Sequence, residues 1–152
     1  MDILVVYGSQ YGNTQRVAQA IGKALAPEHA VRVVQSAEAR TLGGADVDLL
    51  IVGAPTQMRG LRLLTRSFLD GIEHRGFGPV PAATFDTRVG QTRPGSMASD
   101  VIARRLHAAG CRTIVPPESF LVADVEGPLA PGELDRAADW ARSVADTAIA
   151  RA

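Results

Sequence analysis

The chain has 152 residues, a length that suits one compact domain, and its 46% hydrophobic content is enough for a buried core. Its 16 basic residues balance its 16 acidic residues, so the total charge gives no reason to expect binding to nucleic acid or to an anionic membrane. A single cysteine excludes an internal disulfide and favours a reducing cytoplasm. The sequence has no long apolar run, so we expect neither a signal peptide nor a membrane span.

The first part of the chain alternates strand-like and helix-like segments. Residues 3–7 are a short, β-branched apolar run, which predicts a strand. Val17, Ile21 and Leu25 then recur at a spacing of four residues, as they would on one face of a helix. Residues 30–34 predict a second strand.

The middle of the chain repeats this alternation. A short helix capped by Ser36 is one interpretation of the polar segment after the second strand. Residues 49–54 are continuously apolar, as expected of a central parallel strand that is buried on both faces. Residues 82–85 predict a short fourth strand. Between these two strands, a helix face is marked by Leu61, Leu64, Phe68 and Ile72.

The last third predicts two helices and a divided strand. A helix with apolar positions over residues 97–106 ends before Gly110, a typical C-terminal glycine. Residues 113–115 and 119–122 predict a fifth strand that a Pro-Pro step breaks in two. A long helix over residues 134–148 follows.

Five strands that alternate with helices predict an α/β fold, a doubly wound five-stranded parallel sheet with helices on both faces. We expect residues 1–152 to form a single domain of this kind. Ligands of such sheets bind beyond the carboxyl ends of the strands. The candidate loops are therefore residues 8–14, 55–60 and 86–95, all of them rich in Gly, Thr, Ser, Gln or Arg.

The first loop, residues 7–14 (YGSQYGNT), has the features of an anion site that contains no basic residue. A helix that begins near the end of this loop exposes unpaired N–H groups and the positive end of its dipole. Two glycines let the backbone curl, and Ser9 and Thr14 add hydroxyl donors. The loop lacks the Gly-Lys-Ser/Thr ending of nucleoside triphosphate loops and the spacing of the dinucleotide fingerprint. The alternative is an ordinary strand-to-helix turn capped by Asn13 or Ser9.

Residues 5–14, continued by Ala18 and Ile21, resemble the flavodoxin signature. That signature joins an apolar strand and an aromatic residue to Ser or Thr, a small residue, Thr, and then Ala and an aliphatic residue in the helix. Every position agrees, and the order of elements resembles that of flavodoxins along the whole chain. In flavodoxins this loop wraps the phosphate of FMN. The resemblance therefore implies FMN as the cofactor, with phosphate contacts from Ser9, Gln10, Tyr11, Gly12, Asn13 and Thr14.

The other two loops depart from the usual flavodoxin pattern. Flavodoxins commonly hold the flavin ring between two aromatic residues in these loops, but neither loop here contains Trp, Tyr or Phe, and Trp140 falls in the last predicted helix. Met58 could pack on one face of the ring, and Arg88 or Arg93 could stack on the other. The resemblance adds to the cofactor site Pro55, Thr56, Gln57, Met58, Arg59, Gly60, Asp86, Thr87, Arg88, Gly90 and Arg93.

Two short motifs point to a subgroup. Asp86-Thr87-Arg88 and Glu126-Gly127-Pro128-Leu129 resemble a group of short flavodoxin-family proteins. The segment around the fifth strand has no room for the inserted loop of long-chain flavodoxins, so the chain is closer to the short-chain type.

The other residue types that often carry chemistry do not suggest a second site. The three histidines lie far apart in sequence and lack metal-ligand spacing, and Cys111 is expected to be a buried structural thiol. Residues 53–55 lack the serine of a nucleophile elbow, and the acids of a phosphorelay receiver are missing. Arg59, Arg62 and Arg66 are either solvated charges or part of a rim for a partner or a substrate. We assign no catalytic and no metal-binding residue.

The leading hypothesis is an FMN-binding electron carrier of the flavodoxin type that passes electrons from a reductase to an acceptor protein. A small FMN-dependent oxidoreductase, with a quinone or porphyrinogen as substrate, is the first alternative. The second is a scaffold that keeps the fold and binds no flavin.

Overall fold

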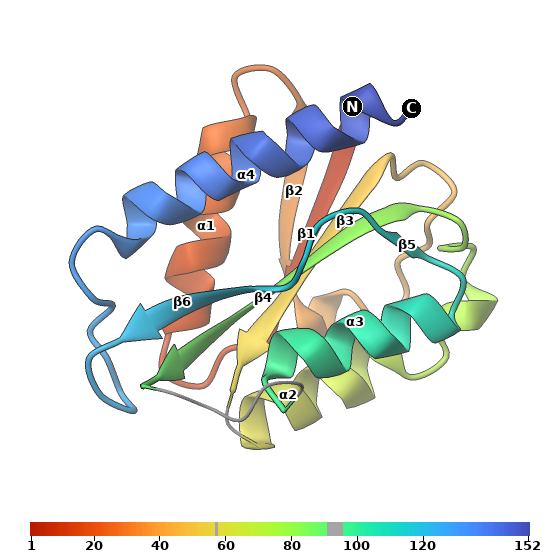
Figure 1. Ribbon diagram of the computed structural model, residues 1–152. Helices are drawn as coiled ribbons and strands as arrows, with labels where there is room; N and C mark the ends of the chain where they lie inside the picture. The colour runs from red at the N-terminus through yellow and green to blue at the C-terminus, as the bar shows by residue number, and fades with distance from the viewer. Residues whose placement is uncertain (57, 91–95) are drawn as a thin grey trace.

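The computed structural model describes residues 1–56, 58–90 and 96–152. Its strands form a parallel sheet in the order β2-β1-β3-β4-β5, with β6 also paired to β4 (Figure 1). The strands are β1 (Asp2–Tyr7), β2 (Ala30–Gln35), β3 (Leu49–Pro55), β4 (Pro81–Val89), β5 (Arg112–Thr113) and β6 (Glu118–Val122). The α-helices are α1 (Asn13–Leu25), α2 (Met58–Leu64), α3 (Ala98–Ala108) and α4 (Glu133–Ala150).

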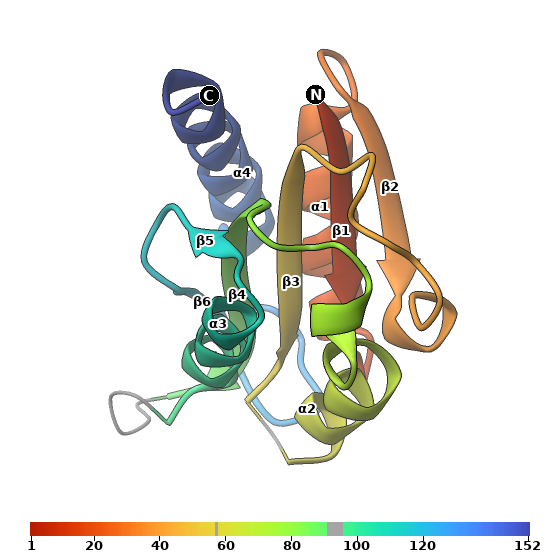
Figure 2. The same cartoon turned by 90° about the vertical axis from the view of Figure 1, so that its right-hand side faces the viewer.

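Helices cover both faces of the sheet, so the predicted doubly wound architecture is confirmed (Figures 1 and 2). One core lies between the sheet and the helices α1 and α4, and includes Val5, Ile21 and Val144. The other core lies on the opposite face against α2 and α3, and includes Leu50 and Ile102. All residues of β3 are buried, as its continuous apolar run predicts.

The fifth strand position is divided as predicted. β5 pairs with the first residues of β4, and β6 pairs with the last five, Phe85 to Val89. The two short strands flank the Pro-Pro step, because proline lacks the N–H that a strand ladder requires. Gly110 adopts a left-handed conformation with φ of 95° just after α3, which confirms the predicted C-terminal glycine.

Two local predictions are wrong. The helix expected to run through Ile72 ends at Leu64 and continues only as a π-helical turn, Thr65–Leu69. Gly71, with φ of 78°, then reverses the backbone into a separate 3-10 turn. Ser36 is not a helix cap but the first residue of a 3-10 turn, Ser36–Glu38, which makes no side-chain cap bond.

Trp140 packs against the core and Cys111 lies within it. Trp140 packs edge-to-face against Phe85 and Phe120, with ring centroids 6.1 and 5.8 Å away. Cys111 is buried, as predicted, and its thiol donates to the carbonyl oxygen of Phe77. Burial raises the pKa of that thiol to about 11, so it stays protonated at neutral pH. Among the described residues, no helix is both long enough and apolar enough to cross a bilayer.

Candidate functional site

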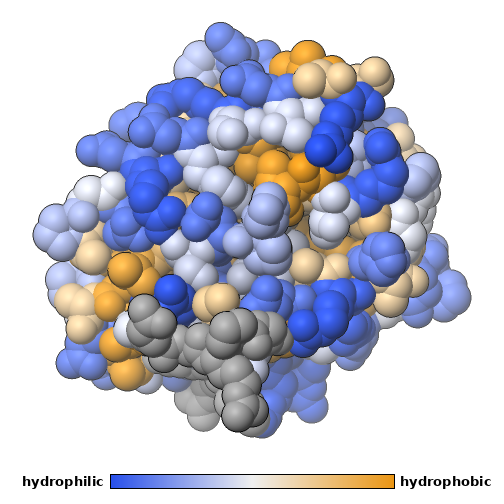
Figure 3. All heavy atoms as spheres, viewed as in Figure 1, coloured by the Kyte–Doolittle hydropathy of each residue, from blue (hydrophilic) through white to orange (hydrophobic). Residues whose placement is uncertain are grey.

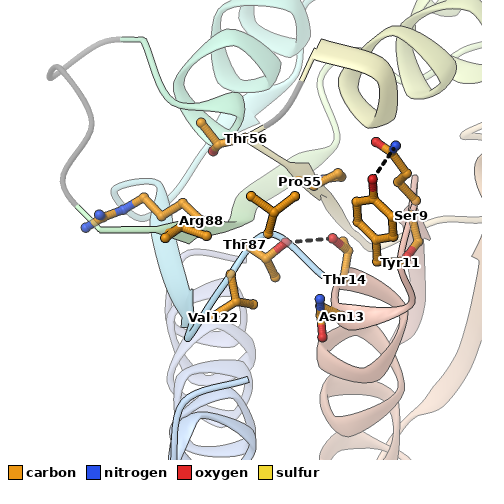
Figure 4. A pocket seen from close by; sticks show the side chains of 12 residues that line it. Ser9, Tyr11, Asn13, Thr14, Pro55, Thr56, Thr87, Arg88 and Val122 are labelled. Carbon is orange, nitrogen blue, oxygen red and sulfur yellow. Dashed lines mark hydrogen bonds between the residues drawn. The ribbon is translucent and has the colours of Figure 1, made fainter. Parts of the chain in front are cut away.

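A pocket opens at the carboxyl edge of the sheet, where the predicted loops meet (Figure 4). Its volume is about 110 Å³, below the roughly 300–1,000 Å³ of sites that enclose a whole small molecule. It therefore suits one end of a larger ligand. The lining residues come from the loop before α1 and the start of α1, from the ends of β3, β4 and β6, and from the turn after β6: Ser9, Gln10, Tyr11, Asn13, Thr14, Pro55, Thr56, Thr87, Arg88, Val89, Val122 and Val125.

The loop that leads into α1 leaves the start of this helix open. Gly12 is the N-cap residue in a left-handed conformation, with φ of 87°, and among the described side chains none caps it. Ser9 Oγ instead accepts a hydrogen bond from the backbone N–H of Gly12, at 3.0 Å. The first turn contains no acidic residue. Because a helix leaves its first N–H groups without intrahelical partners, this end of α1 favours an anion.

A pair of threonines joins this loop to the sheet. The Oγ1 atoms of Thr14 and Thr87 lie 2.8 Å apart, although the two residues are 73 positions apart in sequence. Figure 4 shows the two hydroxyls facing each other between α1 and β4. Both residues are buried, and both line the pocket. The hydroxyl of Thr14, a predicted phosphate ligand, is therefore hydrogen-bonded to Thr87 of β4.

Thr56 directly follows β3 and lines the pocket. Its backbone N–H donates to the carbonyl oxygen of Thr87, at 2.8 Å. Its hydroxyl oxygen accepts a hydrogen bond from the N–H of Ala98, the first residue of α3, at 3.2 Å. Thr56 thus holds the end of β3 against both β4 and the start of α3.

Asp86 does not line the pocket, although the sequence places it in the cofactor site. Side chains alternate along β4, so while Thr87 faces α1, Asp86 faces α3 and is completely buried. Its Oδ2 accepts hydrogen bonds from the backbone N–H and the hydroxyl of Ser99. Its Oδ1 has no hydrogen-bond partner among the described residues. Burial raises the pKa of this carboxyl, while the Ser99 hydrogen bonds act to lower it.

The remaining predicted residues differ in where they lie relative to the pocket. Arg88 lines the pocket, but Figure 4 shows its guanidinium pointing away from Thr14 and Thr87. Gly90 follows β4 in a left-handed conformation, with φ of 59°, and is not among the lining residues. Gln57 and Arg93 lie outside the described residues. Met58, Arg59 and Gly60 form the first residues of α2.

Three valines that the sequence analysis did not place in the site also line the pocket: Val89, Val122 and Val125. Val125 lies in a tight turn after β6, closed by hydrogen bonds from Ala123 N to Pro128 O and from Gly127 N to Asp124 O, each 2.8 Å long. Nothing local in the sequence indicated that this turn packs on α1.

The mouth of the pocket is apolar. Tyr11, Val89 and Val125 are 44%, 41% and 46% exposed, and all three line it. Leu121, within strand β6, is also exposed but does not line the pocket. Figure 3 shows apolar surface at the lower left, around the tip of β6, and further apolar areas higher on the same face. Exposed apolar side chains around a pocket favour contact with a ligand or a partner.

Comparisons with known proteins agree with this architecture. Residues 4–75 match the family model described as a flavodoxin domain. No curated protein sequence matches the chain.

Many solved structures share the fold. A flavodoxin from the domain Archaea is 20% identical, with a TM-score of 0.78 over 97% of this chain and 99% of that one. A flavodoxin variant from Pseudomonas aeruginosa is 17% identical, with a TM-score of 0.76 over 97% and 98%. Rubredoxin oxygen:oxidoreductase from Desulfovibrio gigas is 16% identical, with a TM-score of 0.67 over 98% of this chain and 36% of that one. The fold thus occurs both alone and within longer chains.

Proposed function

Since the chain belongs to the flavodoxin family, we propose that it binds FMN in the pocket at the carboxyl edge of the sheet and carries electrons between protein partners. We further propose that residues 1–152 act as one flavodoxin-like domain. The observation that carries the proposal is the uncapped start of α1, which opens into a pocket whose described lining includes no acidic side chain.

The donors around the pocket fit a terminal phosphate. The first turn of α1 supplies backbone N–H groups and the positive end of the helix dipole. Ser9 and Thr14 keep hydroxyl protons that can point to an anion, because the Ser9 oxygen acts as an acceptor toward Gly12 and the Thr14 oxygen can act as one toward Thr87. Asn13 lines the same end of the pocket. These residues would hold the phosphate without a basic residue.

The size of the pocket fits the same assignment. A volume of about 110 Å³ accommodates a phosphate end and leaves the rest of the cofactor near the ends of β3 and β4. Pro55, Thr56 and Arg88 border that side, and Tyr11, Val89 and Val125 form the apolar mouth. Gln57, Met58, Arg59, Gly60, Gly90 and Arg93 remain proposed cofactor contacts. Bound FMN would supply the redox chemistry, since flavins accept and release electrons.

The side chains around the pocket favour a carrier over an enzyme with its own substrate. In the described lining, Tyr11 and Arg88 are the only titratable residues, so no His, Cys, Asp or Glu stands ready as a general acid or base there. A carrier needs no such group, because it exchanges electrons at an exposed edge of its cofactor. Its partners would be a reductase and an acceptor protein that meet the apolar mouth of the pocket.

One observation favours the alternative, a small FMN-dependent oxidoreductase. The only aromatic residue that lines the described pocket is Tyr11, whose side chain hydrogen-bonds Gln10 at the surface. A flavin ring that is not covered by an aromatic residue is open to a flat substrate such as a quinone. Steady consumption of a quinone with a nicotinamide donor would identify this activity.

A visible absorption spectrum of the purified protein, before and after FMN is added and the excess is removed, tests the proposal. The expected result is a retained flavin spectrum, and reduction of the bound flavin by a flavodoxin reductase with transfer to cytochrome c. A protein that retains no flavin would overturn the proposal and favour the flavin-free scaffold. Bound FMN with quinone turnover, but without transfer to a protein acceptor, would support the oxidoreductase instead.

A further inference from the structure

We infer that Thr87 is a positioning residue for the phosphate site, which acts by holding the Thr14 hydroxyl and makes no phosphate contact of its own. This inference rests on the proposed function and gives Thr87 a different role from the direct cofactor contact that the resemblance implies. It is carried by the 2.8 Å contact between the two Oγ1 atoms and by the burial of both side chains, which are 1% and 4% exposed.

The number of hydroxyl protons limits how many hydrogen bonds the two threonines can donate to a ligand. Each hydroxyl has one proton to donate, and one of the two protons is used in the hydrogen bond between them. The pair therefore presents a single free donor to the pocket. Thr14 lies in the first turn of α1, beside the N–H groups that would hold the phosphate. An anion at that position accepts a hydrogen bond from the Thr14 hydroxyl. The hydrogen bond between the two threonines is then donated by Thr87 and accepted by Thr14.

Thr87 is well suited to act as an anchor. It lies near the carboxyl end of β4, where the strand is paired on both sides, with Pro55 of β3 and with Phe120 of β6. Its carbonyl oxygen accepts the N–H of Thr56, at 2.8 Å. A β-branched side chain on such a fixed backbone has few rotamers available. The Thr14 hydroxyl is thereby oriented before the ligand arrives, which lowers the cost of binding.

The test is a double-mutant cycle with Thr14→Val and Thr87→Val, read as dissociation constants for FMN and for riboflavin. Valine keeps the branched shape and removes the hydroxyl. Thr87→Val should weaken FMN binding by about three- to tenfold, as expected for one oriented neutral hydrogen bond, and leave riboflavin binding unchanged. In the Thr14→Val protein, the second substitution should cause no further loss. Thr87→Ser, which retains the hydroxyl, should bind FMN like the parent.

Thr84→Val is the matched control. Thr84 is a buried threonine on the same strand, but its hydroxyl donates to the carbonyl oxygen of Ser99 on the opposite face of the sheet, at 3.0 Å. Its replacement should lower stability and leave the ratio of FMN to riboflavin affinity unchanged. A Thr87→Val protein that loses affinity for both flavins equally would show a merely structural role and overturn the inference. If Thr87→Val does not fold, the comparison of Thr87→Ala with Thr87→Ser in both Thr14 backgrounds gives the same cycle.

The outcomes separate this inference from the proposed function. If the two substitutions weaken FMN binding additively, Thr87 contacts the phosphate by itself and the inference is overturned while FMN binding stands. If Thr87→Val binds FMN as the parent does, the inference is also overturned. If the parent binds neither flavin, the proposed function fails and this inference fails with it.

Discussion

Gly127 lies directly against the side chain of Asn13. A Cβ atom at Gly127 would be 2.7 Å from Asn13 Oδ1 and 3.0 Å from Asn13 Nδ2, closer than side chains tolerate. This contact joins the turn after β6 to the start of α1, and so fixes the wall of the pocket that carries Val125. A segment outside the three predicted loops therefore shapes the candidate phosphate site.

Gly127→Ala should both destabilise the protein and weaken FMN binding. Gly127 has φ of 105°, which an alanine adopts only at a cost of roughly 1–2 kcal/mol, and the new methyl group would also displace Asn13. Urea unfolding and an FMN titration measure the two effects. Gly132→Ala is the matched control, since Gly132 has φ of 83° but open space at its Cβ position. Equal FMN affinity in both variants would show that the contact with Asn13 does not support the site.

Ser9→Ala should weaken FMN binding without a large change in stability. Ser9 Oγ is an acceptor for the N–H of Gly12, and its own proton is available to the phosphate. A hydrogen bond to a charged group is worth roughly 1.5–3 kcal/mol, so the affinity should fall about ten- to a hundredfold. Isothermal titration calorimetry with FMN measures this. Riboflavin binding should stay as in the parent, and a parallel loss for riboflavin would place Ser9 away from the phosphate.

Thr56→Val should lower the free energy of unfolding by about 1 kcal/mol, because it removes the acceptor for the first N–H of α3. Urea denaturation followed by circular dichroism measures this loss. Thr56→Ser retains the oxygen and should recover most of the stability. If valine and serine at this position give the same midpoint, the hydrogen bond to Ala98 contributes nothing to the fold.

Asp86 should make the stability of the protein fall as the pH rises above about 4, the ordinary pKa of an unfolded Asp. Burial raises the pKa of this carboxyl in the folded state, so the folded protein holds a proton that the unfolded chain has already released. The loss continues until the pH passes the raised pKa and is constant above it. Asp86→Asn cannot ionise, and should therefore gain stability relative to the parent between pH 4 and neutrality. A difference between the two proteins that does not vary with pH would show that the carboxyl titrates normally.

The sequence was sufficient where structure is determined locally. The uninterrupted apolar run of β3, the Pro-Pro step between β5 and β6, and Gly110 after α3 each predicted the element that is observed. In the same way, the YGSQYGNT loop predicted the open start of α1, because glycines let the backbone curl and leave the first N–H groups of the helix accessible.

The relations between distant segments could not be predicted in this way. Thr14 contacts Thr87 because the sheet places β4 beside the start of α1. Asn13 contacts Gly127 because the turn after β6 packs against the same end of α1. Asp86 is buried on the α3 side because β4 extends past Phe85 and side chains alternate along a strand. The sequence predicts a fourth strand that ends at residue 85 and a loop that begins at Asp86, whereas the strand continues to Val89.

Phosphate recognition by residues 9–14 is tested most directly by titrating the flavin-free protein with FMN and with riboflavin, followed by flavin fluorescence. The two ligands differ only in the phosphate, so their affinity ratio reports on this site alone. FMN should bind more tightly by at least about a hundredfold, because riboflavin forgoes two or more hydrogen bonds to a charged group, each worth roughly 1.5–3 kcal/mol. Comparable affinities for the two flavins would contradict the assignment of the start of α1 as the phosphate site.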